Sequence, residues 1–473
     1  MTLNKKILAT AIVGGLFAAA AQAQVNISAT TPVPVTFASE LVVPAAGLTL
    51  TNLNTTTPPV GILDLQTALR YSFSAGEVRH ARIECSPNIR FATGSVVTLS
   101  AGGTVGAING IGTNAIHFSI TAGTTPATAT DILTVSGDRI VTNTAGGSCT
   151  YSLYDFPSQA AAGGSVGQIA TATGAYLAFA TSYTLTATPT GAVANVEANP
   201  AFSRFVSAAP TGSIERGSLG DVVFALRTAP ATPRLASGAP ATLAALLAAG
   251  SNHVVTGDFS AAADADGTFT STAALARVYF STTADCTAVT TSANVLTATS
   301  ARFNTGPAAV NATLCFAPRS GVAIPVSTYS QVFNAVSANP TLFAPTGRGP
   351  VALGEITRNG TQLQAPLAQI PTGWISRVAL TNTGTVARPY TITAQTEAGV
   401  TAALGTAANG IVPANGTVVL NVADIVQFTG TAPRGTLNVT VAGPTGQIQG
   451  LYQIVNPASG SISNHVMVRP GMN

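Results

Sequence analysis

The 473-residue chain is 46% hydrophobic but only 8% charged, whereas a globular domain has about 25% charged residues. The hydrophobic fraction argues against intrinsic disorder. Twenty Lys+Arg stand against 17 Asp+Glu without a visible basic stripe, and this excludes nucleic acid as a partner because phosphate contacts need clustered cations.

Residues 1–23 have the pattern of a secretory signal peptide. Lys5 and Lys6 give the positive start, an apolar run follows from Ile7 to Ala20, and Ala21-Gln22-Ala23 forms a small-x-small cleavage site. A transmembrane anchor is the alternative, but it would need about 20 strongly apolar residues. We expect export and cleavage before Gln24.

Lys5 and Lys6 are the only lysines in the chain. Lysine on an exposed strand edge prevents edge-to-edge pairing, and its loss leaves strand edges unguarded. Genomic base bias explains the missing lysine equally well. In either case, a surface of Thr, Ser, Asn, Gln, Gly and Ala with almost no net charge repels its own copies very little.

Short runs with period-2 alternation recur along the chain, bounded by Gly, Pro and Asn. They include residues 94–103, 115–123, 131–137, 175–191, 276–283 and 435–444. Alternation of this kind is typical of antiparallel strands with one buried face. The sequence therefore predicts an all-β fold of tandem β-sandwiches with few short helices.

The length exceeds a single core and indicates about three domains. "ANPAF" at 198–202, followed by "APTGSIERGSLGDVVF", resembles "ANPTLF" at 338–343, followed by "APTGRGPVALGEI". Chance echo in an Ala-rich chain is the alternative to duplication. We expect β-domains at 24–200 and 201–345 and a C-terminal immunoglobulin-like β-sandwich at 346–473.

Four cysteines follow this division, because Cys85 and Cys149 lie in the first segment and Cys286 and Cys315 in the second. An exported protein with four cysteines forms two disulfides, for which three connectivities exist. Pairing within each segment is the simplest. Free thiols are the alternative, and metal binding is disfavoured because no CxxC pair or nearby His is present.

Residues 241–250, "ATLAALLAAG", predict the clearest helix, and 422–430 predict a shorter one that Gly430 would end. Between them, "GDFSAAADADGTF" brings Asp258, Asp264 and Asp266 together. Alternating Asp with a turn Gly suits calcium, which takes oxygen ligands. The loop lacks the bidentate Glu of a full motif, and a plain Asp-Gly turn explains it equally well.

The third segment contains strand-like runs at 375–384, 388–397, 416–424, 435–443, 447–457 and 463–470, spaced as in immunoglobulin-like domains. Trp374, the only tryptophan, precedes the first of them. It fits either a core position or an exposed binding aromatic.

Motifs of catalysis are missing from the sequence. The four histidines, His80, His117, His253 and His465, are scattered, and no GxSxG, HExxH, GK[ST] phosphate loop or dinucleotide fingerprint occurs. A glycosidase is harder to exclude, because its two catalytic carboxylates come from distant segments and leave no motif. Acidic residues and histidines are nevertheless scarce, which argues against a hydrolase. We predict a non-enzymatic protein.

In composition, length and layout the chain resembles the surface-layer (S-layer) proteins that sheathe certain Gram-negative cells and their nanopod-like vesicle tubes. The segments behind the resemblance are the leader "KKILATAIVGGLFAAAAQA" and the closing "GLYQIVNPASGSISNHVMVRPG". The resemblance implies a planar or tubular array of identical subunits on the outer surface. It further implies the outer membrane or its lipopolysaccharide as a second partner. Many such layers are tied to calcium, which favours calcium at the Asp258–Asp266 loop.

Self-association would be the mechanism. Weak contacts between β-domain edges and flat Thr/Ser/Asn faces become durable when many act together in a lattice. The alternative is a secreted or pilus-associated adhesin that binds a host or carbohydrate ligand through immunoglobulin-like domains. An adhesin predicts exposed aromatic side chains clustered at one tip, whereas a surface layer predicts none.

Overall fold

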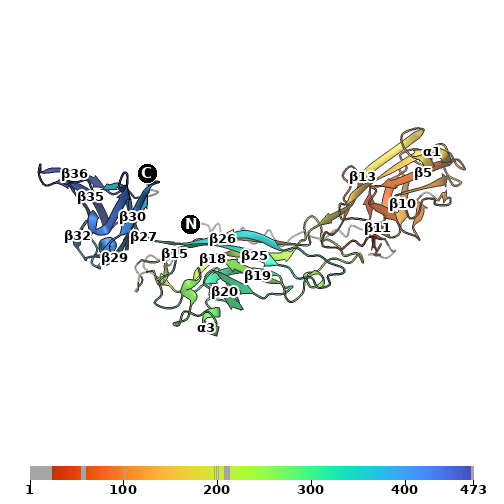
Figure 1. The fold of residues 1–473 in the computed structure, drawn as a ribbon. Helices are drawn as coiled ribbons and strands as arrows, with labels where there is room; N and C mark the ends of the chain where they lie inside the picture. The colour runs from red at the N-terminus through yellow and green to blue at the C-terminus, as the bar shows by residue number, and fades with distance from the viewer. Residues whose placement is uncertain are drawn as a thin grey trace, which may run out of the picture.

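The computed structural model describes residues 24–54, 60–100, 102–196, 198, 200, 202–206 and 213–469. The predicted signal peptide, residues 1–23, lies outside this part of the chain. The predicted all-β fold is confirmed, since strands in several sheets form most of the regular structure. Three lobes follow one another along an elongated molecule, in the order of the sequence (Figure 1).

The first lobe contains three sheets around one apolar core. The core gathers residues from Val25 to Leu177 and includes Phe37, Phe91 and Tyr176. The sheets have the orders β1-β4-β10-β7, β3-β11-β6 and β2-β13-β12-β5-β9-β8. Their strands are β1 (Val25–Asn26), β2 (Val35–Ala38), β3 (Leu48–Leu50), β4 (Leu65–Ala68), β5 (Val78–Cys85), β6 (Ile89–Phe91), β7 (Val96–Leu99), β8 (Thr104–Val105), β9 (Ala115–Thr121), β10 (Ile132–Ser136), β11 (Arg139–Val141), β12 (Gly147–Tyr154) and β13 (Gln168–Ala180).

The second lobe packs a five-stranded sheet, β14-β18-β24-β20-β21, against an eight-stranded sheet, β17-β16-β15-β26-β25-β19-β23-β22. Phe224, Phe280 and Phe333 lie in its core. Its strands are β14 (Tyr183–Pro189), β15 (Ala192–Ala194), β16 (Phe205–Val206), β17 (Ser213–Ile214), β18 (Gly217–Leu226), β19 (Asn252–Thr256), β20 (Val278–Ser281), β21 (Val289–Ser292), β22 (Val295–Leu296), β23 (Ser300–Phe303), β24 (Val310–Phe316), β25 (Ser327–Asn334) and β26 (Arg348–Arg358).

The third lobe is a sandwich of two four-stranded sheets, β27-β34-β29-β31 and β32-β28-β35-β36, with the hairpin β30-β33 beside it. Its core runs from Leu363 to Met467. Its strands are β27 (Gly360–Gln369), β28 (Ile375–Asn382), β29 (Arg388–Thr396), β30 (Val400–Leu404), β31 (Asn409–Val412), β32 (Gly416–Asn421), β33 (Val426–Gly430), β34 (Arg434–Pro444), β35 (Ile448–Asn456) and β36 (Ser461–Val466).

Alternation places the buried face as the sequence predicts in β34. Leu437, Val439 and Val441 are buried, while Asn438 and Thr440 on the opposite face are partly exposed. Most strand pairs are antiparallel, as expected, but β1 with β4, β2 with β13 and β15 with β26 are parallel. The echo segments end in β18 and β26, which both lie in the second lobe. The predicted domain limits stay a prediction.

The helices are shorter than the sequence predicts. Residues 241–250 form only α2 (Leu243–Leu246), because Leu247 turns to an extended backbone and pairs with Ser337. Similarly, α4 (Val422–Ile425) ends before β33 rather than at Gly430. The other short helices are α1 (Pro157–Ala162), α3 (Thr272–Leu275) and the 3-10 turns η1 (Ser260–Ala262) and η2 (Thr406–Ala408).

A buried ion pair joins the first two lobes. Glu40, which follows β2, accepts hydrogen bonds from the Ser182 backbone N–H and hydroxyl at 3.0 and 2.8 Å. Its Oε1 lies 3.3 Å from a guanidinium nitrogen of Arg348 on β26. That guanidinium stacks over the Tyr183 ring, 4.6 Å from its centre. Three segments far apart in sequence therefore meet at one charge pair.

Candidate self-association surface

The predicted calcium residues lie in one loop, but Asp258 and Asp266 already accept hydrogen bonds from neighbouring residues of that loop. Asp258 Oδ1 accepts from the Ser260 N–H at 2.8 Å, and Asp266 Oδ1 accepts from the Thr268 N–H at 3.0 Å. The Thr268 bonds lower the pKa of Asp266. Within the described residues, no group of three or more His, Cys, Asp or Glu side chains is arranged to hold a metal.

Asp264 is engaged differently, with a cation. Its Oδ1 lies 3.1 Å from Arg277 Nη1, and its pKa is lowered by hydrogen bonding to Ser271 and by Arg277. The pairing already neutralises one of the three carboxylates. Calcium binding at Asp258, Asp264 and Asp266 stays a prediction.

The structure pairs the cysteines within segments, the connectivity that is simplest from the sequence. Cys85 on β5 is bonded to Cys149, the residue directly opposite on β12. Cys286, in the loop after β20, is bonded to Cys315 on β24. Both bridges are buried. The first fixes β5 to β12, and the second fixes the loop after β20 to β24.

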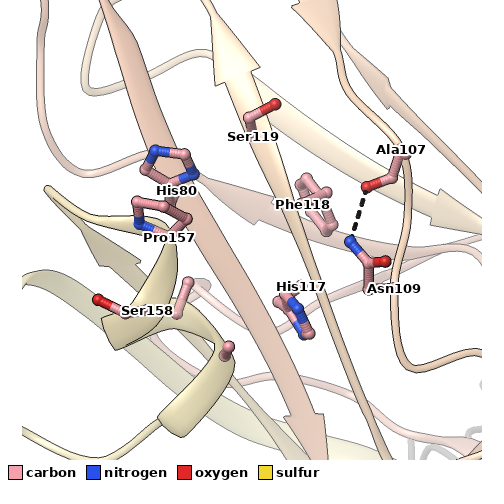
Figure 2. A pocket seen from close by; sticks show the side chains of 10 residues that line it. His80, Ala107, Asn109, His117, Phe118, Ser119, Pro157 and Ser158 are labelled. Atoms are coloured by element: carbon pink, nitrogen blue, oxygen red, sulfur yellow. Dashed lines mark hydrogen bonds between the residues drawn. The ribbon is translucent and has the colours of Figure 1, made fainter.

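His80 and His117 line an open depression of about 520 Å³ between β5, β9 and α1. Figure 2 shows the two imidazoles on the neighbouring strands β5 and β9, with Pro157 and Ser158 on α1. Asn109 is bonded to the Ala107 carbonyl instead of to either ring. Burial, with help from Arg79, lowers the pKa of His80. In the described structure, neither ring has a hydrogen bond to a hydroxyl or a carboxylate.

The other histidines lie far from this depression. His253 is buried in the second lobe beside Gln331, and His465 is exposed on β36, where its Nε2 lies 2.9 Å from the Ser463 hydroxyl. Trp374 is partly buried in the turn before β28. The side chains that could carry chemistry are therefore not gathered at one place.

Several strand edges are covered by other segments. Beside β2, Arg234 exchanges backbone hydrogen bonds with Thr36 and Ala38 at 2.9 and 2.8 Å. Beside β27, Val468 does the same with Gln364 at 2.7 and 2.9 Å. Such covering removes the unpaired N–H and C=O groups through which edges associate.

Within the described part of the chain, no other segment pairs with the outer edge of strand β36. It is the outer strand of its sheet, it contains no charged residue and no proline, and all six of its side chains are exposed. Ile462 and Val466 are 59% and 79% exposed. It lies on the side of the third lobe that faces away from the other two (Figure 1). Sequence alternation cannot reveal this exposure, because it distinguishes two faces without saying whether either is covered.

An apolar row crosses the outer face of the same sheet. Val466 on β36 lies opposite Leu451 on β35, which lies opposite Ala379 on β28, which lies opposite Val419 on β32. Val419 is 59% exposed. This row and the β36 edge together form the candidate self-association surface.

Neither β36 nor the apolar row contains a charged residue. In the first two lobes, several arginines are used inside the fold. Arg139 is fully buried, where its guanidinium donates to the carbonyls of Gly137 and Val135 at 2.6 and 2.9 Å. Arg277 and Arg348 each pair with a carboxylate. Long-range repulsion between copies is correspondingly weak.

Most of the chain matches a known protein family. The family model of S-layer protein Slr4 matches residues 67–456, a span that includes strands of all three lobes. No curated protein matches the chain. Among the described residues, none of the helices has the length and apolar character needed to cross a membrane. The chain therefore belongs to the S-layer protein Slr4 family, and this makes it a structural protein of a cell-surface layer, for which self-association into an array is implied.

Proposed function

We propose that the protein is exported through its leader, residues 1–23, and tiles the outer surface of a Gram-negative cell or of nanopod-like tubes as a self-assembled array. The observation that carries this proposal is the family match over 67–456. The leader pattern and the low charge of the chain support it.

Assembly would proceed by many weak contacts. Each subunit offers an open strand edge and apolar rows with almost no charge, and single contacts of this kind are weak. In a lattice every subunit makes several at once, so that the whole is far more durable than one contact. A single isologous contact stops at a dimer. The array therefore needs either a heterologous contact, which propagates, or a second contact at a different surface.

Attachment and metal dependence form the finer part of the proposal. The array would rest on the outer membrane or its lipopolysaccharide. Calcium would support it through Asp258, Asp264 and Asp266, although Asp258 and Asp266 accept hydrogen bonds within their own loop and Asp264 is paired with Arg277. We also propose that the chain is divided into tandem β-domains at 24–200, 201–345 and 346–473, the last immunoglobulin-like.

An adhesin would present aromatic side chains at one tip. Among the large apolar side chains that are exposed in the described structure, the aromatic ones are Tyr71 and Phe156, 38% and 61% exposed. Both lie in the first lobe, and Arg79 lies over the Tyr71 ring. The family match does not favour an adhesin, and we do not adopt that function.

Electron microscopy of the purified protein tests the proposal. Protein concentrated in the presence of calcium should form regular sheets or tubes, and chelation with EGTA should reduce them if calcium takes part. Persistence of the array in EGTA would remove only the calcium part. Monodisperse monomers at every concentration, with and without calcium, would contradict self-assembly itself.

A further inference from the structure

The open edge of β36 has a definite hydrogen-bonding pattern. The Met467 N–H donates to the Gly450 carbonyl at 3.0 Å, so this residue faces β35. Along an antiparallel ladder the inward and outward directions alternate from residue to residue. Ser461, Ser463 and His465 therefore face β35, and the N–H and C=O groups of Ile462, Asn464 and Val466 point away from it.

This pattern fits a second copy of the same strand. If two β36 strands run antiparallel about a two-fold axis at Asn464, the outward residues pair with each other: Asn464 with Asn464, and Ile462 with Val466 twice. Each such pair exchanges two backbone bonds, so that about six form. In this register, each pair of opposite residues places both side chains on the same face of the sheet, as sheet geometry requires.

The side chains agree with this register. Ile462 and Val466, both largely exposed in the single chain, would cover each other as cross-strand apolar pairs, which stabilise a sheet. Asn464, at the axis, is held by Gln453 Nε2, which donates to its Oδ1 at 2.8 Å. A shift by one residue would place Ile462 opposite His465, a residue of the other face.

Charge does not oppose the pairing. In the row of Asn464, the neighbours across the sheet are Gln453 and then Arg377. With strands about 4.8 Å apart, the two Arg377 side chains of a pair of copies would be separated by roughly 24 Å, well beyond the screening length of about 8 Å at physiological salt.

The opposite edge of the sheet, β32, is less suited to pairing. Its residues alternate between partly buried and exposed, and Val418 and Leu420 pack against the core of the lobe. The chain leaves the strand directly into α4 at Val422, so neighbouring backbone lies close to its end. Val419 on β32 is nevertheless as exposed as Ile462, which makes it a matched control position.

We propose that β36 is a homotypic contact, which joins two copies into one continuous eight-stranded sheet about a two-fold axis at Asn464. The proposal rests on the proposed function, because it names one of the contacts of the array. It places two third lobes together with the first lobes at the far ends. Since a two-fold contact closes on itself, the array needs a different second contact elsewhere.

Disulfide trapping with N464C tests the register. Opposite residues of a hydrogen-bonded pair have Cα atoms about 5.5 Å apart, within the range of a disulfide. The described residues contain no free cysteine to interfere. On mild oxidation, N464C should give a covalent dimer on non-reducing gels with at least tenfold higher yield than V419C. Equal yields, or a monomer in both, would overturn the proposal.

A proline variant tests the edge without touching the internal ladder. Because the Asn464 N–H points outward, N464P keeps every backbone bond to β35 and removes both backbone bonds at the axis. Of the bonds to β35, it loses only the side-chain bond from Gln453 Nε2. The variant should keep the circular dichroism spectrum and melting temperature of the wild type and lose its two-fold contact in images of the array. A wild-type lattice formed by N464P would overturn the proposal.

The two proposals fail separately. A wild-type array in which N464C does not cross-link overturns the β36 contact and leaves self-assembly standing. Efficient N464C dimers without any array support the β36 contact and contradict the proposed function.

Discussion

His253 is an imidazole enclosed by phenylalanines at the centre of the second lobe. Its ring centre lies 4.9 Å from that of Phe333 and 5.2 Å from that of Phe224, and Nδ1 is 2.7 Å from Gln331 Nε2. Burial away from water lowers the pKa of His253 to about 4 from its ordinary 6.5, because a charged ring is costly in an apolar surrounding.

We predict that acid destabilises the second lobe through this residue. The folded-state pKa lies below the unfolded one, so the unfolded chain takes up the proton first and stability falls as the pH drops from about 6.5 to 4. The loss should approach about 3 kcal/mol and then level off. Urea unfolding at several pH values measures it. In H253L this part of the pH dependence should vanish, and an unchanged slope would contradict the assignment.

Glu40 gives a second prediction at the scale of a residue. E40A leaves the partly buried Arg348 guanidinium without its carboxylate, which should lower the free energy of unfolding by about 3 kcal/mol. E215A is the control, since it breaks the exposed pair of Glu215 with Arg204 at 3.4 Å and should cost less than about 1 kcal/mol. Similar losses in the two variants would show that the lobe junction does not depend on Glu40.

At the scale of elements, strand β26 depends on a glycine. A Cβ added to Gly354 would collide with the Thr190 carbonyl oxygen, where β26 crosses the turn between β14 and β15. G354A should therefore shift the backbone and destabilise the lobe by about 2 kcal/mol. Gly191 has open space around its Cβ position, so G191A should have little effect. Thermal unfolding compares the two, and equal stability would refute the close approach.

The disulfides fix β5 to β12 and the loop after β20 to β24. Their loops span 64 residues between Cys85 and Cys149 and 29 between Cys286 and Cys315. Chain entropy gives about 3–4 kcal/mol for each bridge, with the longer loop worth roughly 0.7 kcal/mol more. Calorimetry of C85S/C149S and of C286S/C315S should show both losses. A variant that melts like the wild type would mean that its bridge does not constrain the unfolded chain.

Local patterns were sufficient for some elements and not for others. Alternation predicts β34 with its buried face of Leu437, Val439 and Val441, since each strand carries that information itself. The run at 241–250 predicts a longer helix than the structure contains. Leu247 pairs with Ser337, 90 residues further on, and this pairing outweighs helix propensity. Propensity is a weak prior that tertiary contacts routinely override.

The candidate site was harder to predict than the strands. The sequence indicates that edges are unguarded by lysine, but which edge is open depends on distant segments such as Arg234 beside β2 and Val468 beside β27. The burial of Arg139 could not be predicted from the sequence either. Its guanidinium donates to backbone carbonyls and lies over the rings of Phe91 and Tyr176, which come from distant segments. No short-range pattern encodes those partners.

At the scale of the whole molecule, assembly should respond little to salt. The elongated subunit ends in the β36 edge, which has no charged residue (Figure 1). Salt therefore has little electrostatic attraction between subunits to screen. Raising sodium chloride from about 0.05 to 0.5 M should change the critical concentration for assembly less than about twofold. Light scattering measures this, and a tenfold rise would show that ion pairs hold the array.

The most direct measurement is electron cryo-tomography of the envelopes of cells that produce this protein, beside cells from which it has been deleted. We predict a regular outer lattice in the first and a bare surface in the second, with subunit averages that contain two-fold contacts between third lobes. A lattice that survives the deletion, or an envelope with scattered single copies of the protein, would contradict it.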